Sequence, residues 1–498
     1  MHPVRRSVLT IGLGLLAGVA LAAEPARKPA PLPAPKTGDQ LRAELGLSGA
    51  SGWMLVDMAT GRVLDSSQAD RPFVPASVAK LPTAAFALDA LGPNHRFETR
   101  LLASGPVKGG RVQGDLVLQG GGNPELDTDA LAELARRLAD KGIRQVTGAL
   151  IADGSALVQV PEIESAQAED SSYNPSVSGL NLNFNRVHVK WDARRGRNEL
   201  SVEAAAERLS PPVSHVSVDV RARPGQRLFA LDLRGGRERW QMAQRAFRGR
   251  AARWLPVKQP EAYAAEVFHN LARDHGISAG RAGTGAAPRN ADTLVSHQSR
   301  PLGKILRDML RYSTNLTAEV TGAAATRSVG IDAQTLAQSA DVMNAWAASV
   351  GGFPVGDPGF RFVNHSGLTT GSKVSPRRMV ELLAAFARRQ ADPSARHGRL
   401  PGGIAGYLKP HNVAAEDFPL DYDRLSVAAK TGTMSYIRGL AGYIATPGGR
   451  QFAFAIFSND LAARGGGAQK VNKRWMGRAK GFERALIRNW VLRFDEGA

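Results

Sequence analysis

The chain has 498 residues, of which 43% are apolar, and it carries a formal net charge of +19 at pH 7 with a sequence pI of about 10.5. This length exceeds one ordinary domain and supplies enough apolar residues for one large core and one or two smaller ones. The absence of cysteine excludes disulfides, thiol nucleophiles and thiolate metal sites. The basic residues are scattered rather than gathered in runs with interleaved aromatics. This argues against nucleic-acid binding and favours an anionic cell-envelope partner.

The N-terminus carries the pattern of an export signal. Two arginines at positions 5 and 6 precede an apolar run over residues 8–19, and Ala20-Leu21-Ala22 offers small residues where a signal peptidase cleaves. We expect residues 1–22 to be a signal peptide, exported by the general secretory or the twin-arginine route, and the mature protein to be periplasmic. The run is shorter than the ~20 residues that span a bilayer, so we expect no transmembrane anchor after cleavage.

Residues 23–38 contain five closely spaced prolines, which predict a stiff, extended linker. Folded sequence is expected to begin near Asp39, with a short helix that reaches Leu45. The segments 53–57 and 62–64, separated by a turn at Thr60-Gly61, then predict a β-hairpin.

The stretch from Val74 to Leu81 is the first to carry candidate chemistry. Apolar residues at helical spacing follow Lys80, so the spacing predicts a helix that begins near Ser77. Ser77 and Lys80 would then share one face of its first turns. A serine becomes a nucleophile when a nearby base takes its proton, and the amine of Lys80 could do so if it were neutral. The plainer alternative is a capped helix with a surface lysine.

Between residues 96 and 291 the pattern changes to short strands, and we expect a self-contained insert here. The predicted strands cover 97–103, 112–118, 145–151, 187–191, 200–204, 216–220 and 228–233, and the predicted helices cover 128–141 and 261–272. Gly120-Gly121-Gly122 lacks the lysine and the following helix of a phosphate loop. We therefore expect a tight turn there and no nucleotide site.

Helical patterns resume from Pro301. Two predicted helices meet at Ser313-Thr314-Asn315, which places Ser313 and Asn315 on a short, rigid turn. Further on, Lys430-Thr431-Gly432-Thr433 is predicted as an edge strand that leads into a turn. A hairpin over 439–445 and 451–458 follows it.

The closing helix has an apolar stripe made of Trp475, Met476, Ala479, Phe482, Leu486 and Trp490. Such a stripe usually packs on the core of its own protein, and we expect this one to pack on the sheet. A weak association with a membrane surface is the alternative.

Three short motifs stand in a fixed order along the chain. Ser77-x-x-Lys80, Ser313-x-Asn315 and Lys430-Thr431-Gly432 have the order and contexts found in the penicillin-binding-protein and β-lactamase superfamily, which the chain resembles. Copies of the last two motifs also occur at Lys36-Thr37-Gly38 and Ser172-Tyr173-Asn174. The first copy lies in the predicted linker and the second is followed by proline, so neither has the expected context.

The long insert between the first motif and the other two resembles the class C low-molecular-mass penicillin-binding proteins, the serine D-alanyl-D-alanine carboxypeptidase/endopeptidase family. Further matching segments are 114–118, 177–183 and Ser366-Gly367-Leu368. The chain departs from the family in having Asn364-His365 before Ser366. It also has only Glu169-Asp170 where a tryptophan-rich acidic stretch is usual.

The resemblance implies an α/β (α+β) fold: a transpeptidase/β-lactamase-like domain with an antiparallel sheet flanked by helices, interrupted by a strand-rich inserted domain. The catalytic domain would be discontinuous, with residues 39–95 and 292–498 on either side of the insert at 96–291. Members of this family act on peptidoglycan stem peptides and are acylated by β-lactam antibiotics. The resemblance implies no metal and no organic cofactor.

The resemblance also implies a role for each motif. Ser77 would attack the carbonyl between two D-alanines and form an acyl-enzyme, with Lys80 as its base and Ser313 as the relay of the proton to the leaving amine. The N–H groups of Ser77 and Thr433 would form the oxyanion hole. Lys80 would be neutral because burial and a charged Lys430 lower its pKa. The substrate-binding residues would be Asn315, Lys430, Thr431, Gly432 and Thr433.

Two other classes of function stay open at this point. One is a β-lactamase or esterase on the same motifs, and the other is a catalytically silent cell-wall binding protein. The long insert argues against the first, and the pairing of Lys80 with Ser77 argues against the second. His365 is a tempting second base, but we expect it to be structural, and we expect Glu319 to be a solvated helix residue.

Overall fold

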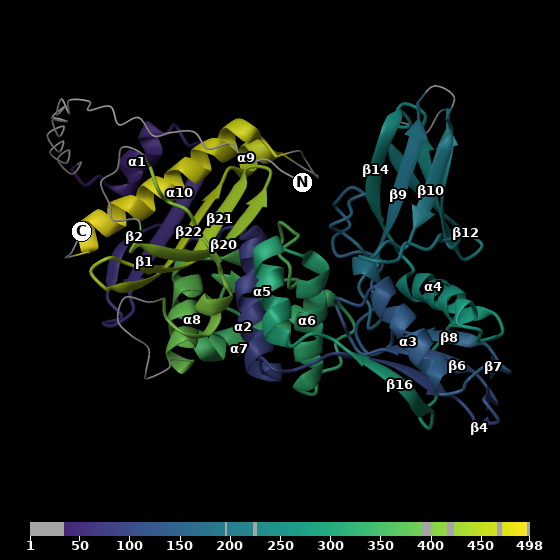
Figure 1. Cartoon of the computed structure of the whole chain (residues 1–498). Coiled ribbons are helices and arrows are strands. Elements are labelled where there is room, and N and C mark those ends of the chain that lie inside the picture. Colours follow the sequence, from purple (N-terminus) through teal and green to yellow (C-terminus); the bar gives the residue numbers. More distant parts are fainter. Residues whose placement is uncertain are drawn as a thin grey trace, which may run out of the picture.

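The structure is a computed structural model that describes residues 34–194, 197–222, 227–390, 400–415, 423–465 and 471–495. The predicted signal peptide and residues 23–33 of the predicted linker lie outside the described residues. Figure 1 shows two bodies side by side. One combines the beginning and the end of the chain, in purple and in green to yellow, and the other contains the middle of the chain, in blue and teal. Among the described helices, none has both the length and the apolar character needed to cross a membrane.

The first body is organised around a six-stranded antiparallel sheet. Its strands, in spatial order, are β19 (Lys409–Pro410), β20 (Ser426–Met434), β21 (Ile437–Ala445), β22 (Gln451–Asn459), β1 (Ala50–Asp57) and β2 (Val63–Ser67). Both predicted hairpins of this domain are present, as the pairs β1–β2 and β21–β22. The pairing of β1 with β22 joins the first part of the chain to the last.

One face of the sheet is covered by α10 (Lys473–Phe494), with α1 (Gly38–Glu44) beside it. Side chains alternate between the two faces of a strand, so on β22 Phe452 and Phe454 reach the core under α10 while Ala453 and Ala455 reach the opposite core. All six side chains of the apolar stripe on α10 are buried in this core. The prediction that the helix packs on the sheet is confirmed, and the stripe is not free to lie on a membrane.

The other face carries α2 (Lys80–Leu91), α5 (Leu302–Tyr312), α6 (Asn315–Ser328), α7 (Leu336–Gly351) and α8 (Pro376–Arg389). Helix α2 contacts α5, α6 and α7 and is buried from Lys80 to Leu88. Its residues are apolar on all sides, which suits a helix at the centre of a core. Pro82 lies in the first turn, where its missing N–H has no partner within the helix in any case.

Residues 36–38, predicted as linker, belong to this first body. The backbone N–H of Lys36 donates to Asn489 Oδ1 at 2.9 Å, and Thr37 caps α1. Gly38 is buried so close to Trp53 that an added Cβ would lie 2.2 Å from the indole ring. The predicted boundary at residue 38 is therefore too late, because capping and burial start before the helix does.

The second body begins with a five-stranded sheet in the order β15 (Ala282–Thr284), β8 (Leu150–Asp153), β6 (Leu116–Gly120), β3 (Glu98–Ala103) and β16 (Asp292–Gln298). Helices α3 (Thr128–Asp140) and α4 (Pro260–Asp274) pack on it. Strand β16 pairs with β3, so the insert continues to residue 298. This corrects the predicted boundary at 291, because β16 closes the sheet of the insert before the chain returns to the first body.

The rest of the insert consists of a small three-stranded sheet, in the order β4 (Val107–Lys108), β5 (Arg111–Val112), β7 (Gln145–Val146), and of two larger three-stranded sheets. One has the order β10 (Glu199–Glu203), β9 (Arg186–Ala193), β14 (Gly249–Pro256), and the other has the order β11 (Val216–Arg221), β13 (Arg237–Ala243), β12 (Phe229–Arg234). Strands β13 and β14 were not predicted. The predicted strand 145–151 is two strands, β7 (Gln145–Val146) and β8, because the chain turns at Gly148, whose N–H donates to Gly114 O.

The remaining short elements connect the larger ones. They are β17 (Phe360–Arg361), β18 (Lys373–Val374), η1 (Ala76–Ala79), η2 (Asn183–Asn185), η3 (Gly403–Tyr407) and α9 (Leu461–Arg464).

A buried ion pair fastens α10 to the sheet. Arg438 on β21 donates from Nε and Nη2 to both carboxylate oxygens of Glu483 on α10, at 2.8–2.9 Å. The two side chains are 5% and 2% exposed. The remaining Nη1 of Arg438 donates to Thr433 Oγ1 at 2.9 Å, at the end of β20. The pair therefore connects the outer helix to the strand that carries the third sequence motif.

We predict that Glu483→Gln destabilises the first body by about 3–5 kcal/mol, because it leaves the buried guanidinium of Arg438 without a counter-charge. Thermal unfolding followed by circular dichroism measures this as a lowered midpoint. The double variant Arg438→Met/Glu483→Met removes both charges and should be less destabilised than Glu483→Gln. An unchanged midpoint in the single variant would contradict the assignment.

Candidate active site

Ser77 lies on the short 3₁₀ helix η1, directly before α2. The predicted helix therefore starts three residues later than expected, at Lys80. The turn is tight: Ala76, just before the serine, has a φ of +48°. Ser77 still faces Lys80, whose Nζ lies 3.1 Å from Ser77 Oγ. Ser77 is half-buried, whereas the lysine side chain is fully buried.

The amine of Lys80 has three polar neighbours. Besides Ser77 Oγ, it lies 2.7 Å from Asn315 Oδ1 and 2.7 Å from the backbone carbonyl of Ser366. The two oxygens can only accept hydrogen bonds. The orientation of the Asn315 amide is consistent with this, since its Nδ2 donates to Tyr173 O at 2.9 Å. A neutral amine has two protons, so it would give both to these oxygens and direct its lone pair at the hydroxyl of Ser77.

The surroundings of Lys80 favour this neutral form. Burial lowers the pKa of the Lys80 amine well below its usual value, and the nearby Lys430 lowers it further. The carboxylate of Glu319 acts in the opposite direction. Burial is the largest of these effects, so the balance is toward the unprotonated amine.

Ser313 and Lys430 form the second part of the site. Ser313 ends α5 in the left-handed region, with φ of +61°, and its Oγ accepts from Lys430 Nζ at 3.0 Å. Lys430 Nζ also donates to Thr431 O at 2.7 Å. Burial, together with the charge of Arg438, lowers the pKa of Lys430 to about 7. This pKa lies well below that of an ordinary lysine, and the expectation that Lys430 is charged in the working site stays a prediction.

Strand β20 lies directly against the turn that carries Ser77. A Cβ added to Gly432 would lie 2.2 Å from Pro75 O and 3.1 Å from Ser77 N, so only glycine fits this approach. Lys430 and Gly432 alternate with Thr431 and Thr433 along the strand. Thr433 is exposed and its hydroxyl accepts from Arg438, while within the described residues the hydroxyl of Thr431 has no hydrogen-bond partner. Neither threonine hydroxyl contacts Ser77 or Lys80, so both remain open to a ligand.

Glu319 was predicted to be solvated, and the structure places it in the core with no exposed surface. Its two carboxylate oxygens accept the backbone N–H groups of His365 and Ser366 at 3.0 and 2.8 Å. Burial raises the pKa of Glu319, and these donors together with Lys80 oppose that rise. Glu319 therefore fixes the loop whose Ser366 carbonyl accepts a hydrogen bond from Lys80. Glu319 follows Asn315 by four residues, so the two side chains lie on the same face of α6. This spacing was the signal in the sequence that could have placed Glu319 near the site.

His365 has the structural role that was predicted. It is fully buried, its Nε2 lies 2.8 Å from Ser339 Oγ, and burial lowers its pKa to about 3. A Cβ added to Gly322 on α6 would lie 2.2 Å from the imidazole ring, so the loop and the helix are in close contact. The imidazole makes no contact with Ser77.

The insert also contributes to the site. Tyr173, from the second body, accepts the Nδ2 hydrogen bond of Asn315 with its backbone carbonyl, while 52% of the residue is exposed. A carbonyl contact depends on the fold and not on the side chain, so no sequence signal identified it. Arg438 donates to Thr433, and Glu483 pairs with Arg438. Both residues were missed because Glu483 is distant in sequence from every motif and no local pattern pairs it with Arg438. Within the described ranges, no group of three or more histidine, aspartate or glutamate side chains is arranged to hold a metal ion.

The comparisons with known proteins identify the family of the chain. Residues 40–477 match the model of the D-Ala-D-Ala carboxypeptidase 3 (S13) family. The chain belongs to this family. It is 30% identical over 455 residues to a D-alanyl-D-alanine carboxypeptidase from an Actinomadura species, with 84% of this chain and 80% of that protein covered. It is 25% identical to the D-alanyl-D-alanine carboxypeptidase DacB of Haemophilus influenzae, over 77% of this chain and 80% of that one.

The fold has also been seen in a solved structure. The crystal structure of penicillin binding protein 4 (dacB) from Haemophilus influenzae superposes with a TM-score of 0.73, at 20% identity, and covers 92% of this chain and 99% of that one. The protein is thus an enzyme of the S13 carboxypeptidase family with the predicted α/β architecture, a helix-flanked antiparallel sheet with a strand-rich insert.

We predict that Glu319→Gln lowers the maximal rate of acylation by a β-lactam about tenfold, since the amide can no longer accept from both N–H groups and the Ser366 carbonyl shifts. Removing the negative charge also lowers the pKa of Lys80. The rate rises with pH as Lys80 loses its proton, so the midpoint should move to lower pH. Stopped-flow acylation between about pH 5 and pH 10 measures both effects.

Glu381→Gln, a half-buried glutamate on α8 that pairs with Arg378 and has no contact with the Ser366 loop among the described hydrogen bonds, is the matched control and should behave like the wild type. If Glu319→Gln keeps both the maximal rate and the midpoint of the wild type, Glu319 does not position the site.

Proposed function

We propose that this protein is a serine-type D-alanyl-D-alanine carboxypeptidase and endopeptidase that acts on peptidoglycan stem peptides through an acyl-enzyme on Ser77. The observation that carries the proposal is the environment of Lys80: a buried amine within hydrogen-bond distance of two acceptor-only oxygens and of the serine hydroxyl. The names of the Actinomadura and Haemophilus relatives support the same substrate class.

In the acylation step, Ser77 Oγ attacks the carbonyl carbon between the last two D-alanines, and Lys80 Nζ takes the serine proton. The oxygen of the tetrahedral intermediate would be held by the N–H groups of Ser77 and Thr433. The closeness of β20 to the Ser77 turn at Gly432 supports this pairing, because it brings the two backbones together.

The C–N bond breaks when the leaving amine receives a proton. Ser313 is suited to pass that proton on, because its Oγ contacts Lys430 Nζ. If the amine belongs to a terminal D-alanine the reaction is a carboxypeptidase cleavage, and if it belongs to a cross-linking side chain it is an endopeptidase cleavage. Water then attacks the ester, takes the place of Ser77 and releases the shortened peptide.

Lys430 is the proposed partner of the substrate carboxylate, with Thr431 and Thr433 as hydroxyl donors beside it. Its lowered pKa of about 7 has a consequence for binding. A carboxylate next to the amine raises that pKa again, so Lys430 becomes charged when substrate arrives. Asn315, fixed between Lys80 and Tyr173, is placed to orient the substrate amide.

The β-lactamase alternative needs a group that activates the deacylating water. Glu319 is the buried carboxylate nearest to this chemistry, but both of its oxygens already accept backbone N–H groups and no part of it is exposed. A β-lactam would therefore form an ester with Ser77 that is released slowly. The ring-opened amine stays attached to the acyl group and blocks the path of water.

We predict that a fluorescent penicillin labels the wild type durably at one site, on the peptide that contains Ser77. Ser77→Ala should lose both the label and the release of D-alanine from purified peptidoglycan, measured by mass analysis of the products. Ser172→Ala, in the sequence copy of the second motif, should keep both.

A label on Ser313 or Ser366 would overturn the assignment of the nucleophile. Rapid loss of the label would indicate a β-lactamase, and absence of any label on a folded wild type would indicate a silent binding protein.

The periplasm is the proposed location, supported by the leader pattern over residues 1–22 and by the cell-envelope substrate. We predict that the protein recovered from cells begins near Ala23, because the small residues before it suit a signal peptidase. Mass spectrometry of the intact protein from the periplasmic fraction measures this. Recovery of the chain from the cytoplasm with Met1 in place would contradict export.

A further inference from the structure

The insert contains a cavity of about 880 Å³ that the proposed reaction does not use. We call it the junction pocket, because it lies where the β10-β9-β14 sheet meets the start of α3 and the end of β16. Its walls include Arg186, His188 and Lys190 on β9, Trp254 on β14, Phe184 on η2 and Arg300 after β16. Its volume is in the range of ordinary ligand sites, about 300–1,000 Å³.

Arg186 is the unusual residue of this pocket. Its guanidinium carbon lies 5.1 Å from the centre of the Phe184 ring and 5.2 Å from that of Trp254, so the group is held beside both rings. Its Nε is buried without a hydrogen-bond partner. Throughout the described residues, the side chain of Arg186 makes no hydrogen bond and no ion pair. Burial also lowers the pKa of its guanidinium. The buried Nε–H of Arg186 therefore lacks a hydrogen-bond acceptor, and an anionic ligand could supply one.

The neighbouring lysine and arginine side chains already have acidic partners. Lys190 pairs with Glu203, and Arg300 pairs with Glu125 and Asp308. His188 stacks on Trp254 with ring centres 4.5 Å apart, and burial lowers its pKa, so it is neutral at pH 7. Among the arginines and lysines that line the junction pocket, Arg186 is the one without an ion pair in the described residues, and Glu125, Asp127 and Glu207 also line the pocket.

The backbone before Arg186 is strained in a way that fixes the Phe184 ring. Asn183, Phe184 and Asn185 have φ angles of +51°, +58° and +51°. Three successive non-glycine residues in this region are costly and persist only where the surroundings hold them. Buried amides do so here: Asn183 bonds to Thr128 and Tyr263, and Asn185 bonds to Leu182 N–H and Ser176 O. The pocket is thus preformed.

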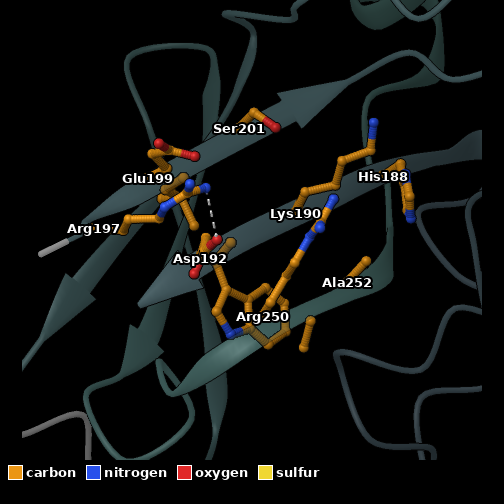
Figure 2. A pocket seen from close by; sticks show the side chains of 11 residues that line it. His188, Lys190, Asp192, Arg197, Glu199, Ser201, Arg250 and Ala252 are labelled. Carbon is orange, nitrogen blue, oxygen red and sulfur yellow. Dashed lines mark hydrogen bonds and ion pairs between the residues drawn. The ribbon is translucent and has the colours of Figure 1, made fainter. Parts of the chain in front are cut away.

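A second cavity, of about 630 Å³, continues along the same sheet face and shares His188 and Lys190 with the junction pocket. Figure 2 shows these two side chains on β9 with Arg250 from β14 close by, while Arg197 is paired with Asp192. The two cavities together offer room for an extended ligand that is anchored at Arg186.

We propose that the junction pocket is a second binding site for peptidoglycan stem peptides, in which Arg186 binds a peptide carboxylate. The proposal rests on the proposed function, which makes this polymer the substrate. A planar carboxylate fits the two-pronged geometry of a guanidinium, and Trp254 with His188 offers a flat aromatic wall beside it. A stem peptide carries such carboxylates along an extended backbone. Binding here would hold one strand of the polymer while another is cleaved at Ser77.

Phosphate groups of anionic envelope polymers present related chemistry, and the experiment separates the two sources. The full-length mature protein is first acylated with penicillin, which closes the Ser77 site. Soluble stem-peptide fragments, the same fragments with their carboxylates amidated, and inorganic phosphate are then titrated by calorimetry. Mass spectrometry of the acylated protein reports on the proposed function separately, because acylation does not depend on the junction pocket.

The acylated wild type should bind the fragments, and Arg186→Met should weaken this binding about tenfold or more, since a charged hydrogen-bond partner is lost. Arg186→Lys should also weaken it, because it keeps the charge but loses the second prong. Arg221→Gln, an exposed arginine of the same insert paired with Asp219, is the matched control and should bind normally. Amidated fragments should not bind.

Turnover gives a second measure. Arg186→Met should slow the digestion of intact peptidoglycan while leaving the acylation rate by penicillin at the wild-type value, which also shows that the variant is folded. Fragment binding that is equal in the wild type, Arg186→Met and Arg186→Lys would overturn the proposal. So would the absence of fragment binding to the acylated wild type, or binding of phosphate but not of the fragments.

Discussion

The site depends on one constraint: a lysine amine must be buried and still have a partner for every proton it keeps. Lys80 meets it through Asn315 Oδ1 and the carbonyl of Ser366, which leaves Ser77 as the third neighbour. Each of these partners comes from a different part of the chain, so the packing of α2 against α6 and against the 364–368 loop is a requirement of the chemistry. Glu319 accepts hydrogen bonds from the backbone of that loop and so keeps the Ser366 carbonyl in position beside Lys80.

Burial also explains why two lysines can work in one site. Burial removes water from both amines and so lowers the pKa of Lys80 and of Lys430. The charge of Lys430 lowers the pKa of Lys80 further. In the proposed mechanism Lys430 regains its proton when a substrate carboxylate arrives. Lys80 lies beside neutral acceptor oxygens, and the nearby carboxylate of Glu319 opposes the lowering of its pKa. The two amines thus differ in what surrounds them, and on this difference we base the proposal that Lys80 takes the serine proton and Lys430 binds the substrate.

The sequence predicted those parts of the protein that local pattern determines. The hairpins, the stripe on α10 and the positions of the three motifs follow from period and spacing. Strands β13 and β14 were missed because they contain many charged residues, including the buried Glu238 on β13, and their pairing partners fix them instead. Glu319 was misjudged because a glutamate on a helix is usually solvated, and only the tertiary position of the Ser366 loop gives it partners. The end of the insert at β16 likewise depends on a pairing with β3 that no local pattern reveals.

The most direct test of this account is the pH dependence of acylation, measured by single-turnover reaction with a β-lactam, in the wild type and in Lys430→Met. With Lys80 neutral in the folded protein, the wild-type rate should rise and level off well below the ordinary lysine pKa of 10.5. The midpoint of Lys430→Met should lie at higher pH, since one of the charges that lowers the pKa of Lys80 is gone. A wild-type rate that still climbs at about pH 10 would contradict the account, because Lys80 would then be an ordinary, protonated lysine at neutral pH.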